Sequence, residues 1–407
     1  MRVDPAVARP RSMLAPLRHR DFRLLWTGLL VSNTGSWMQF VAVGYLIDRL
    51  TLSPFYLGLL ALCQGLPRLV FAVVGGALAD RWDRRALLFW TNAFLAASAL
   101  VLTLLTVTGV VEVWHVILIA ALNSVVMSFD MPARHSMVPA LVEEDEVLQA
   151  VSLNSVAFNG AGIFGPSLGG ALIAVVGEAG CFAINTLSYA GVLVALARMS
   201  PTARREVASG DRVFEEIREA FALLRTNRVV LWALLSVAVL NFFGRPYFRL
   251  MPAFAREVLH TDATGLGLLQ AAPGLGTVLS AWYVSRVVGR SRGRLLSGAT
   301  LWFGACVVLF ALSGGLWPAL LLLVATGLFQ SVAMSSANAL VQTSVDPGMR
   351  GRAMGLYSMT AFGMFALGSF PLGALAAFVG VPASLTLGGA LTAVVALALR
   401  PRLRGVA

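Results

Sequence analysis

Lysine is absent from this chain of 407 residues, so all 31 of its basic side chains are arginines. A Walker A phosphate-binding loop needs a lysine, and so does a Schiff-base enzyme. ATP-driven pumping by this chain alone is therefore not expected. The three cysteines lie apart in apolar segments, and the four histidines lack metal-ligand spacing. We expect no metal, no cofactor and no catalytic residue, because no nucleophile–base pair can be assembled; the chain is not expected to be an enzyme.

Charge of either sign is also scarce. Charged residues make up 13% of the chain and the mean hydropathy is +0.79, whereas ordinary globular proteins carry about 25% charged residues. A soluble core cannot absorb so much apolar sequence, but membrane-spanning helices can. The polar, basic start has no cleavable signal pattern, and the first apolar run is too long for the apolar region of a signal peptide. We expect the first helix to be retained.

Twelve apolar runs, bounded by charged or turn residues, are each able to cross a bilayer as a helix. The runs fall at 22–48, 54–79, 86–109, 113–137, 148–176, 179–198, 229–253, 263–288, 294–313, 316–337, 352–378 and 381–399. The sequence thus predicts an all-α membrane protein. An even number of spans places both termini on one side of the membrane.

Arginine is distributed unequally between the two sides. The side of the termini carries 26 of the 31 arginines, and the rest are Arg49, Arg68, Arg245, Arg249 and Arg256. Arginine-rich loops stay in the cytoplasm, so we expect a multi-pass plasma-membrane protein with both termini cytoplasmic. The net charge of +11 lies mostly in short loops between apolar runs, so nucleic acid is not an expected partner.

The two halves of the chain resemble each other. LGLL recurs at 57–60 and 266–269, RRALL at 84–88 has its counterpart in GRLL at 293–296, SVVMS at 124–128 resembles SVAMS at 331–335, and GPSLGGAL at 165–172 parallels GSFPLGAL at 368–375. The offsets are nearly constant, which predicts two pseudo-symmetric six-helix bundles, 1–198 and 229–407. The linker 199–228 is predicted to hold an amphipathic helix on the cytoplasmic membrane surface, with a protein-binding helix as the alternative.

Three motifs carry a resemblance to a known family. The loop after the second span reads GGALADRWDRR, Arg-Gly-Arg stands at 350–352, and GPSLGGAL lies in the fifth span. With twelve spans and a long central loop, the chain resembles the major facilitator superfamily over nearly its whole length. The segment 243–260 and GPSLGGAL resemble the branch that includes the enterobactin exporter and related drug exporters. Asp83 departs from the family pattern, which has glycine there; aspartate tolerates left-handed turn geometry.

The resemblance implies two gating motifs. The first comprises Gly76, Asp80, Arg81, Arg84 and Arg85, which would lock the cytoplasmic side against the start of span eleven; the alternative is charge that sets topology alone. The second comprises Gly165, Pro166, Gly169 and Gly170, and resembles the antiporter motif of exporters, although Ala161 replaces a further glycine of that motif. Pro166 is expected to kink the helix. The alternative is a kinked packing helix with no bearing on transport direction.

Polar residues inside spans are costly and usually face a cavity or a partner. They gather in spans one, four, seven and ten, which line the central cavity in the superfamily. The substrate-cavity candidates, including Gln64 of span two, are Asn33, Ser36, Gln39, Gln64, Asn123, Met127, Asn241, Arg245, Gln330 and Asn338. For any one of them a helix–helix hydrogen bond is the alternative. Aromatic residues of the same spans favour an amphipathic solute, with lipid-facing positions as the alternative.

Arg68 lies too deep in span two for its side chain to reach either membrane surface, at about 1.5 Å per residue. Asp130 of span four is at a similar depth, so we expect an Arg68–Asp130 pair that serves proton coupling, with Asp48 as the next candidate. The alternatives are a static pair, or an Asp130 that caps the loop around Pro132. The sequence therefore predicts a proton-coupled exporter of a small amphipathic drug, siderophore or metabolite, acting in the lipid bilayer with no required oligomer. The alternatives are an importer or symporter, and a lipid-moving or non-transporting scaffold.

Overall fold

The computed structural model describes residues 12–199, 222–286 and 291–404; within 72–81 it describes the backbone and not the side chains. The amphipathic helix expected in the linker falls on residues 200–221, outside this part. The described elements are helical throughout.

The first bundle contains five continuous helices, α1 (Arg20–Thr51), α2 (Pro54–Arg81), α3 (Arg84–Val107), α4 (Val113–Ala140) and α5 (Val147–Arg198), and the short 3₁₀ turns η1 (Ala15–Arg18) and η2 (Glu144–Glu146). The 52-residue α5 holds the fifth and sixth predicted spans. They divide at Gly177, whose φ of 70° lies in the left-handed region that glycine tolerates.

The second bundle begins with one interrupted span: α7 (Arg228–Val239), a π-helix η3 (Leu240–Gly244) and α8 (Tyr247–Glu257). It continues with α9 (Ala263–Arg286), α10 (Arg292–Ala311), α11 (Leu316–Thr343), the turn η4 (Pro347–Met349), α12 (Arg350–Val379) and α13 (Val381–Arg404). The twelve predicted spans are thus confirmed.

Nine helices in the described ranges are long and apolar enough to cross a membrane by composition alone. One of them is the double span α5. Neither α1 nor α9 is among them; in α1 the polar residues Ser32, Asn33, Ser36 and Gln39 interrupt the apolar stretch. Polar contacts with neighbouring helices, as well as apolar packing, hold α1 and α9 in their bundles.

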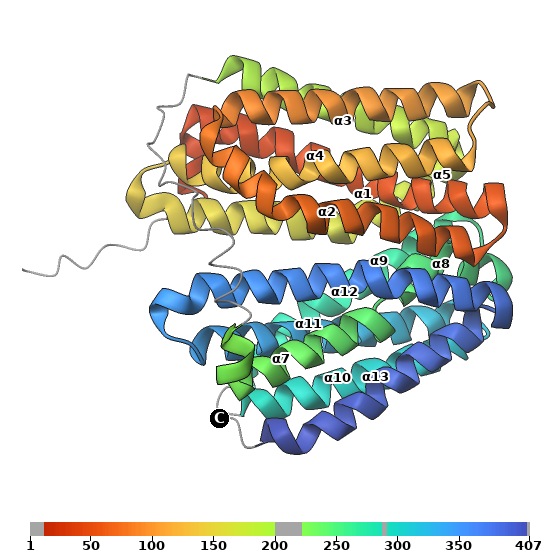
Figure 1. Cartoon of the computed structure of the whole chain (residues 1–407). Helices are drawn as coiled ribbons and strands as arrows, with labels where there is room; N and C mark the ends of the chain where they lie inside the picture. Colours follow the sequence, from red (N-terminus) through yellow and green to blue (C-terminus); the bar gives the residue numbers. More distant parts are fainter. Residues whose placement is uncertain (1–11, 200–221, 287–290, 405–407) are drawn as a thin grey trace, which may run out of the picture.

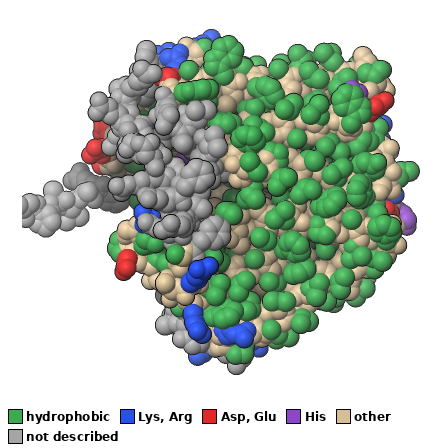
Figure 2. Space-filling model, in the orientation of Figure 1, with side chains coloured by type: hydrophobic (Ala, Val, Ile, Leu, Met, Phe, Trp, Pro, Cys, Tyr) green, Lys and Arg blue, Asp and Glu red, His purple; other side chains and the backbone are tan. Residues whose placement is uncertain are grey.

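The two bundles lie side by side (Figure 1), with α2 packed against α12 and α5 packed against α9. Helices α1 and α13 respectively begin and end at one end of the molecule, which we call the terminal end; the other is the opposite end. Figure 2 shows hydrophobic side chains over most of the described part of one face, with charged side chains gathered at the two ends. Phe378, Val175 and Trp317 are at least three-quarters exposed, as expected of side chains that contact lipid.

The hairpin between α2 and α3 shows how the chain ends one span and starts the next. Asp83 has φ −60° and ψ 119°, and its side chain accepts a hydrogen bond of 2.7 Å from the backbone N–H of Ala86. Aspartate is a preferred N-cap residue. Asp83 therefore starts α3 from extended geometry, and the left-handed turn that the family's glycine suggested is not formed.

Candidate functional site

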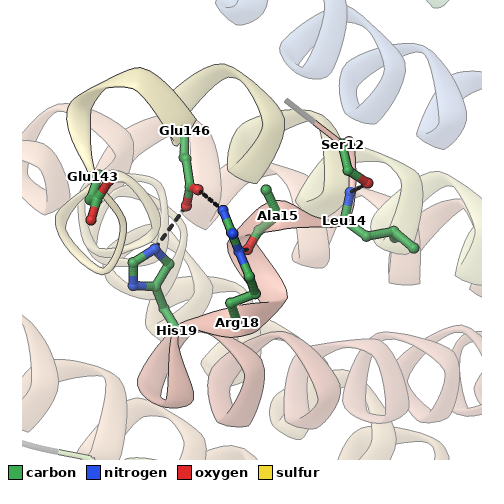
Figure 3. Close-up of a pocket in the computed structure, with 7 residues that line it drawn as sticks. All are labelled: Ser12, Leu14, Ala15, Arg18, His19, Glu143 and Glu146. Atoms are coloured by element: carbon green, nitrogen blue, oxygen red, sulfur yellow. Dashed lines mark hydrogen bonds and ion pairs between the residues drawn. The ribbon is translucent and has the colours of Figure 1, made fainter. Parts of the chain in front are cut away.

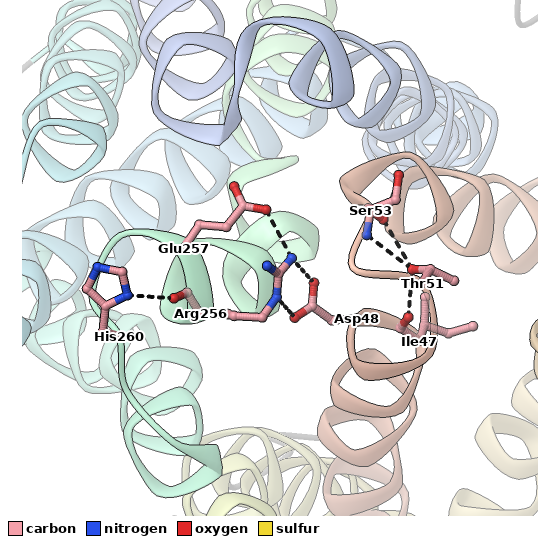
Figure 4. Close-up of polar contacts among 7 residues, drawn as sticks. All are labelled: Ile47, Asp48, Thr51, Ser53, Arg256, Glu257 and His260. Atoms are coloured by element: carbon pink, nitrogen blue, oxygen red, sulfur yellow. Dashed lines mark hydrogen bonds and ion pairs between the residues drawn. The ribbon is translucent and has the colours of Figure 1, made fainter.

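The two bundles are joined at the opposite end by an ion pair. Arg256 of α8 donates two hydrogen bonds to Asp48 of α1, of 2.7 and 3.0 Å, and a third of 3.0 Å to Glu257 (Figure 4). Asp48 is 4% exposed. A bidentate arginine–carboxylate contact is both directional and strong, so the pair holds α1 and α8 together across the bundle interface.

Glycines bring the backbones of the two bundles together near the same end. A Cβ added to Gly58 of α2 would lie 3.1 Å from the Cα of Gly373 of α12. A Cβ added to Gly170 of α5 would lie 2.7 Å from the Cα of Gly267 of α9. The two contacts are related by the internal repeat, and each allows a helix approach that a larger residue would prevent.

The motif at 165–170 faces both bundles. Added Cβ atoms at Gly165 and Gly169 would meet Trp37 and Met38 of α1, in the same bundle, whereas Gly170 meets α9 of the other. Helical dihedral angles continue through Pro166, and the one break within α5 is at Gly177. The motif is therefore placed both to pack α5 and to control its distance from α9.

Helix α4 of the first bundle packs against α2, α3, α5 and α1. Toward the opposite end, the ion pair and the two glycine contacts join the two bundles.

Asp130 is fully buried inside the first bundle, and the expected pair with Arg68 is not formed among the described residues. Asp130 instead accepts hydrogen bonds from Arg134 at 2.6 Å, from Thr91 at 2.8 Å and from Asn92 at 2.9 Å. The physical reason is proximity along one helix: α4 is helical from Val113 to Ala140, so Arg134 lies one turn beyond Asp130 and reaches its carboxylate directly. The spacing of four residues between an aspartate and an arginine is itself a sequence signal for such a pair.

Several cavity candidates bind helices of their own bundle. Asn33 accepts from Arg134 at 3.1 Å, Ser36 contacts the hydroxyl of Tyr189 at 3.0 Å, and Gln39 accepts from Asn185 at 2.6 Å. The backbone carbonyl of Gln64, in span two, accepts a hydrogen bond from Ser124 of α4. For these contacts the structure favours helix–helix hydrogen bonding.

The remaining candidates are distributed over α4, η3 and α11. Asn123 has a buried amide oxygen with no partner in the described residues, and Met127 and Gln330 are partly buried. Asn241 is fully buried; its amide oxygen accepts from Arg245 at 3.1 Å. Asn338 accepts from Gln342 at 2.7 Å.

A second arginine, Arg249, was not among the sequence candidates. It lies one turn beyond Arg245, and the guanidinium carbons of Arg245 and Arg249 lie 4.7 and 5.7 Å from the ring centre of Phe365 on α12. Arg249 also lies 4.5 Å from the ring centre of Phe40 on α1. Arg249 therefore lies between a ring of each bundle, and Arg245 shares the ring of α12 with it. The position of Arg249 inside the predicted span 229–253 was the sequence signal that could have identified it as a candidate.

The predicted gating arginines that can be placed bind carbonyls of their own bundle. Arg84 donates to the Ser136 carbonyl at 3.3 Å, and Arg85 donates to those of Leu196 and Ala197 at 2.7 and 3.0 Å. Cations at helix C-terminal ends are favoured by the helix dipole. The side chains of Asp80 and Arg81, and the surroundings of Gly76, lie outside the described part.

A polar pocket at the terminal end belongs to the first bundle alone (Figure 3). Glu146 accepts from Arg18 at 2.7 Å and contacts His19 at 2.8 Å, joining η1 to the start of α5. Glu146 is 1% exposed. This pocket anchors the chain before α1 and does not lie between the bundles.

The chain is similar in sequence to known membrane transporters. A family model described as transmembrane secretion effector matches residues 11–406. An uncharacterized MFS-type transporter of Bacillus subtilis, YfiS, is 28% identical over 90% of this chain and 89% of that protein. Macrolide efflux protein A of Streptococcus pyogenes is 27% identical over 63% of this chain and 64% of that protein.

Enterobactin exporter EntS of Citrobacter koseri is 24% identical over 94% of this chain and 91% of that protein. Among solved structures, a bacterial homolog of the human lysosomal transporter Spinster superposes with a TM-score of 0.74 at 15% identity, covering 94% of this chain and 97% of that one. The structural likeness establishes the fold. The family model and the matches to YfiS and EntS cover nearly the whole chain.

Proposed function

The chain belongs to the transmembrane secretion effector family of the major facilitator superfamily, and from that premise we propose that this transporter exports a small amphipathic solute in exchange for protons. It is a membrane transporter and not an enzyme. Export, proton coupling and the class of solute are the proposal.

The observation that carries the proposal is closure of the bundle interface at one end. The ion pair Asp48–Arg256 and the contacts Gly58–Gly373 and Gly170–Gly267 all lie toward the opposite end. Two bundles that can rock about a central site expose that site to each side in turn. The structure corresponds to the state that is shut at the opposite end.

We place the terminal end in the cytoplasm, because most arginines lie on that side. The bundles 1–198 and 229–407 are then joined by a cytoplasmic linker, 199–228. The terminal hairpin with Gly76, Asp80 and Arg81 would close the cytoplasmic side in the other state, with Asp80 beside the start of α12, where Arg350 and Arg352 stand.

The outward direction rests on two observations. Gly170 of the exporter-like motif forms part of the interface between the bundles. Two of the relatives are by name a macrolide efflux protein and an enterobactin exporter. We extend their direction of transport to this chain.

Proton coupling is assigned to Asp130, which the structure pairs with Arg134. The carboxylate is buried inside the first bundle and its partner lies on the same helix, so the ion pair can open within that bundle. Movement of Arg134 would therefore load Asp130, and its return would release the proton. Asp48 is the next candidate, since its partner Arg256 belongs to the other bundle.

The test is dye transport in inverted membrane vesicles from cells that lack their own efflux pumps. An exporter accumulates an amphipathic dye in such vesicles when respiration acidifies the interior, and an uncoupler abolishes the accumulation. Uncoupler-sensitive uptake into intact cells instead would indicate an importer. A fully expressed protein that moves none of a broad dye panel in either direction would contradict the transport proposal.

A further inference from the structure

Arg245, at the break in span seven, and Arg249 of α8 share the ring of Phe365 on α12. Arg68 lies on α2, the helix of the other bundle that packs against α12, and we group the three as one cluster. Resting on the transport function proposed above, we propose that this cluster binds the anionic group of the solute. The solute class is then a small aromatic anion that carries a carboxylate or a group of similar chemistry.

Arg245 and Arg249 are oriented by aromatic rings. Both stack on Phe365, and Arg249 also stacks on Phe40, which comes from the other bundle. A guanidinium stacked on a ring keeps its N–H donors at its edges, where they can form two parallel hydrogen bonds to a carboxylate. Arg249 is thus held between Phe40 of one bundle and Phe365 of the other.

Arg68 lies at the level of the same phenylalanine. On either side of it in α2, Gly65 packs against Ala366 and Leu69 packs beside Gly363, so Arg68 lies at the depth of the turn of α12 that carries Phe365.

The cluster has no counter-ion of its own. Elsewhere in the described ranges Arg18, Arg49, Arg134 and Arg256 each form an ion pair with a carboxylate, whereas Arg68, Arg245 and Arg249 form none. Arg245 donates to the neutral amide of Asn241, and the buried Nε of Arg249 has no hydrogen-bond partner.

Unpaired cations within a membrane are costly, and three together repel one another. An anion that enters the cluster relieves both costs. The same charges disfavour a cationic solute, so the cluster also selects against cations.

Aromatic side chains beside the cluster provide an apolar surface. Phe40 and Phe248 stack with ring centres 5.7 Å apart, and Trp37 meets Phe40 edge-on at 5.6 Å. An aromatic ring of the solute would pack there while its anionic group meets the arginine edges.

The experiment compares two dyes that share a xanthene skeleton and differ in charge. Carboxyfluorescein is anionic and rhodamine 6G is cationic; binding of each to the purified full-length protein in phosphatidylcholine nanodiscs is measured by fluorescence anisotropy. We expect saturable carboxyfluorescein binding that salicylate competes away, and at least tenfold weaker binding of rhodamine 6G.

Three variants test the assignment. Arg249→Gln and Arg245→Gln should each weaken carboxyfluorescein binding at least tenfold, and Arg249→Lys should recover part of the loss because it restores charge without the planar fork. The matched control is Arg286→Gln, which removes an arginine stacked on Trp282 at 3.9 Å away from the cluster and should leave binding unchanged. Unaltered binding in both glutamine variants would overturn the proposal, as would tighter binding of rhodamine 6G or no saturable binding of carboxyfluorescein.

Two further measurements distinguish a lipid headgroup from a solute as the anion, and the anion site from the proposed export. Loss of dye binding when phosphatidylglycerol is added to the nanodiscs would support the anion site and identify a lipid headgroup as its occupant. Proton-driven transport of rhodamine 6G without carboxyfluorescein binding would retain export and reject the anion site. Carboxyfluorescein binding by a protein that transports nothing would retain the anion site and reject export.

Discussion

Buried charges in this chain are of two kinds, paired and unpaired. Asp130 and Asp48 are 0% and 4% exposed, and each is matched by an arginine. Asp130 pairs within one bundle and Asp48 pairs across two. The first pair can form or break within one bundle, whereas the second is broken whenever the bundles separate.

Asp130→Asn should abolish proton movement driven by the solute, because an amide cannot take up or release the proton. The amide oxygen can still accept from Thr91 and Asn92, but Arg134 would be left unpaired, at a cost of about 3–5 kcal/mol. The double variant Asp130→Asn with Arg134→Gln removes that cost. The measurement uses a pH-sensitive dye inside proteoliposomes.

Arg286→Gln serves as the control, because it removes an arginine that stacks on Trp282 and leaves both Asp130 and Arg134 in place. Solute-dependent proton movement at the parental rate in the folded double variant would remove Asp130 from the mechanism. Asp48 would then be tested in the same assay.

Asp48→Asn should open the opposite end more often. The charged hydrogen bonds that it weakens are worth about 1–3 kcal/mol, so the ratio of open to closed molecules should rise roughly 5- to 150-fold. The reporter is Leu57→Cys, at a side chain beside Gly44 and Pro252, in a background where Cys63, Cys181 and Cys306 are serine. Its labelling by an impermeant maleimide added at the opposite end is measured.

The charge swap, Asp48→Arg with Arg256→Asp, should return labelling toward the parental level. If labelling is the same in the parent, the single variant and the swap, the ion pair does not control this end.

At the scale of elements, hydropathy predicted the spans but not their internal breaks. The pair of helices within α5 was separated correctly because Gly177 follows a long apolar run. The π-helix at Leu240–Gly244 was not predicted, since apolar and aromatic residues continue through it. Side-chain partners were harder still: similar depth in the membrane suggested a pair of Asp130 with Arg68, whereas Asp130 pairs with Arg134, one turn along the same helix.

Gly170→Val tests the contact between α5 and α9. A Cβ at this position would overlap the backbone around Ala263 and Gly267, so the bundles could not close at the opposite end. We expect a folded protein whose transport rate falls at least tenfold and whose Leu57→Cys reporter is labelled faster. Transport is measured per molecule in inverted vesicles.

Gly160→Val, in the same helix, is the matched control. A Cβ added there would meet no atom of a neighbouring helix within 4 Å. Equal transport by the two variants would mean that the contact of α5 with α9 is scaffold alone.

At the scale of the whole molecule, the distribution of arginine predicts orientation. Green fluorescent protein fused after Ala407 should fluoresce, because it folds in the cytoplasm, whereas alkaline phosphatase fused there should be inactive. The same phosphatase fused after Thr51, between α1 and α2, should be active. The reverse pattern would place the termini outside and would also reverse the assignment of the closed end.

The two ends of the molecule should be energetically linked, since closing one requires opening the other. Asp48 stabilises closure of the opposite end, and in our proposal Asp80 stabilises closure of the terminal end. Asp80→Asn should therefore slow labelling of the Leu57→Cys reporter, the opposite of the change caused by Asp48→Asn, and it should weaken transport without loss of protein from the membrane. In the double variant the two shifts should largely cancel, because both act on one equilibrium. Effects of the same sign, or no effect of Asp80→Asn on labelling, would show that the terminal hairpin sets topology and does not act as a gate.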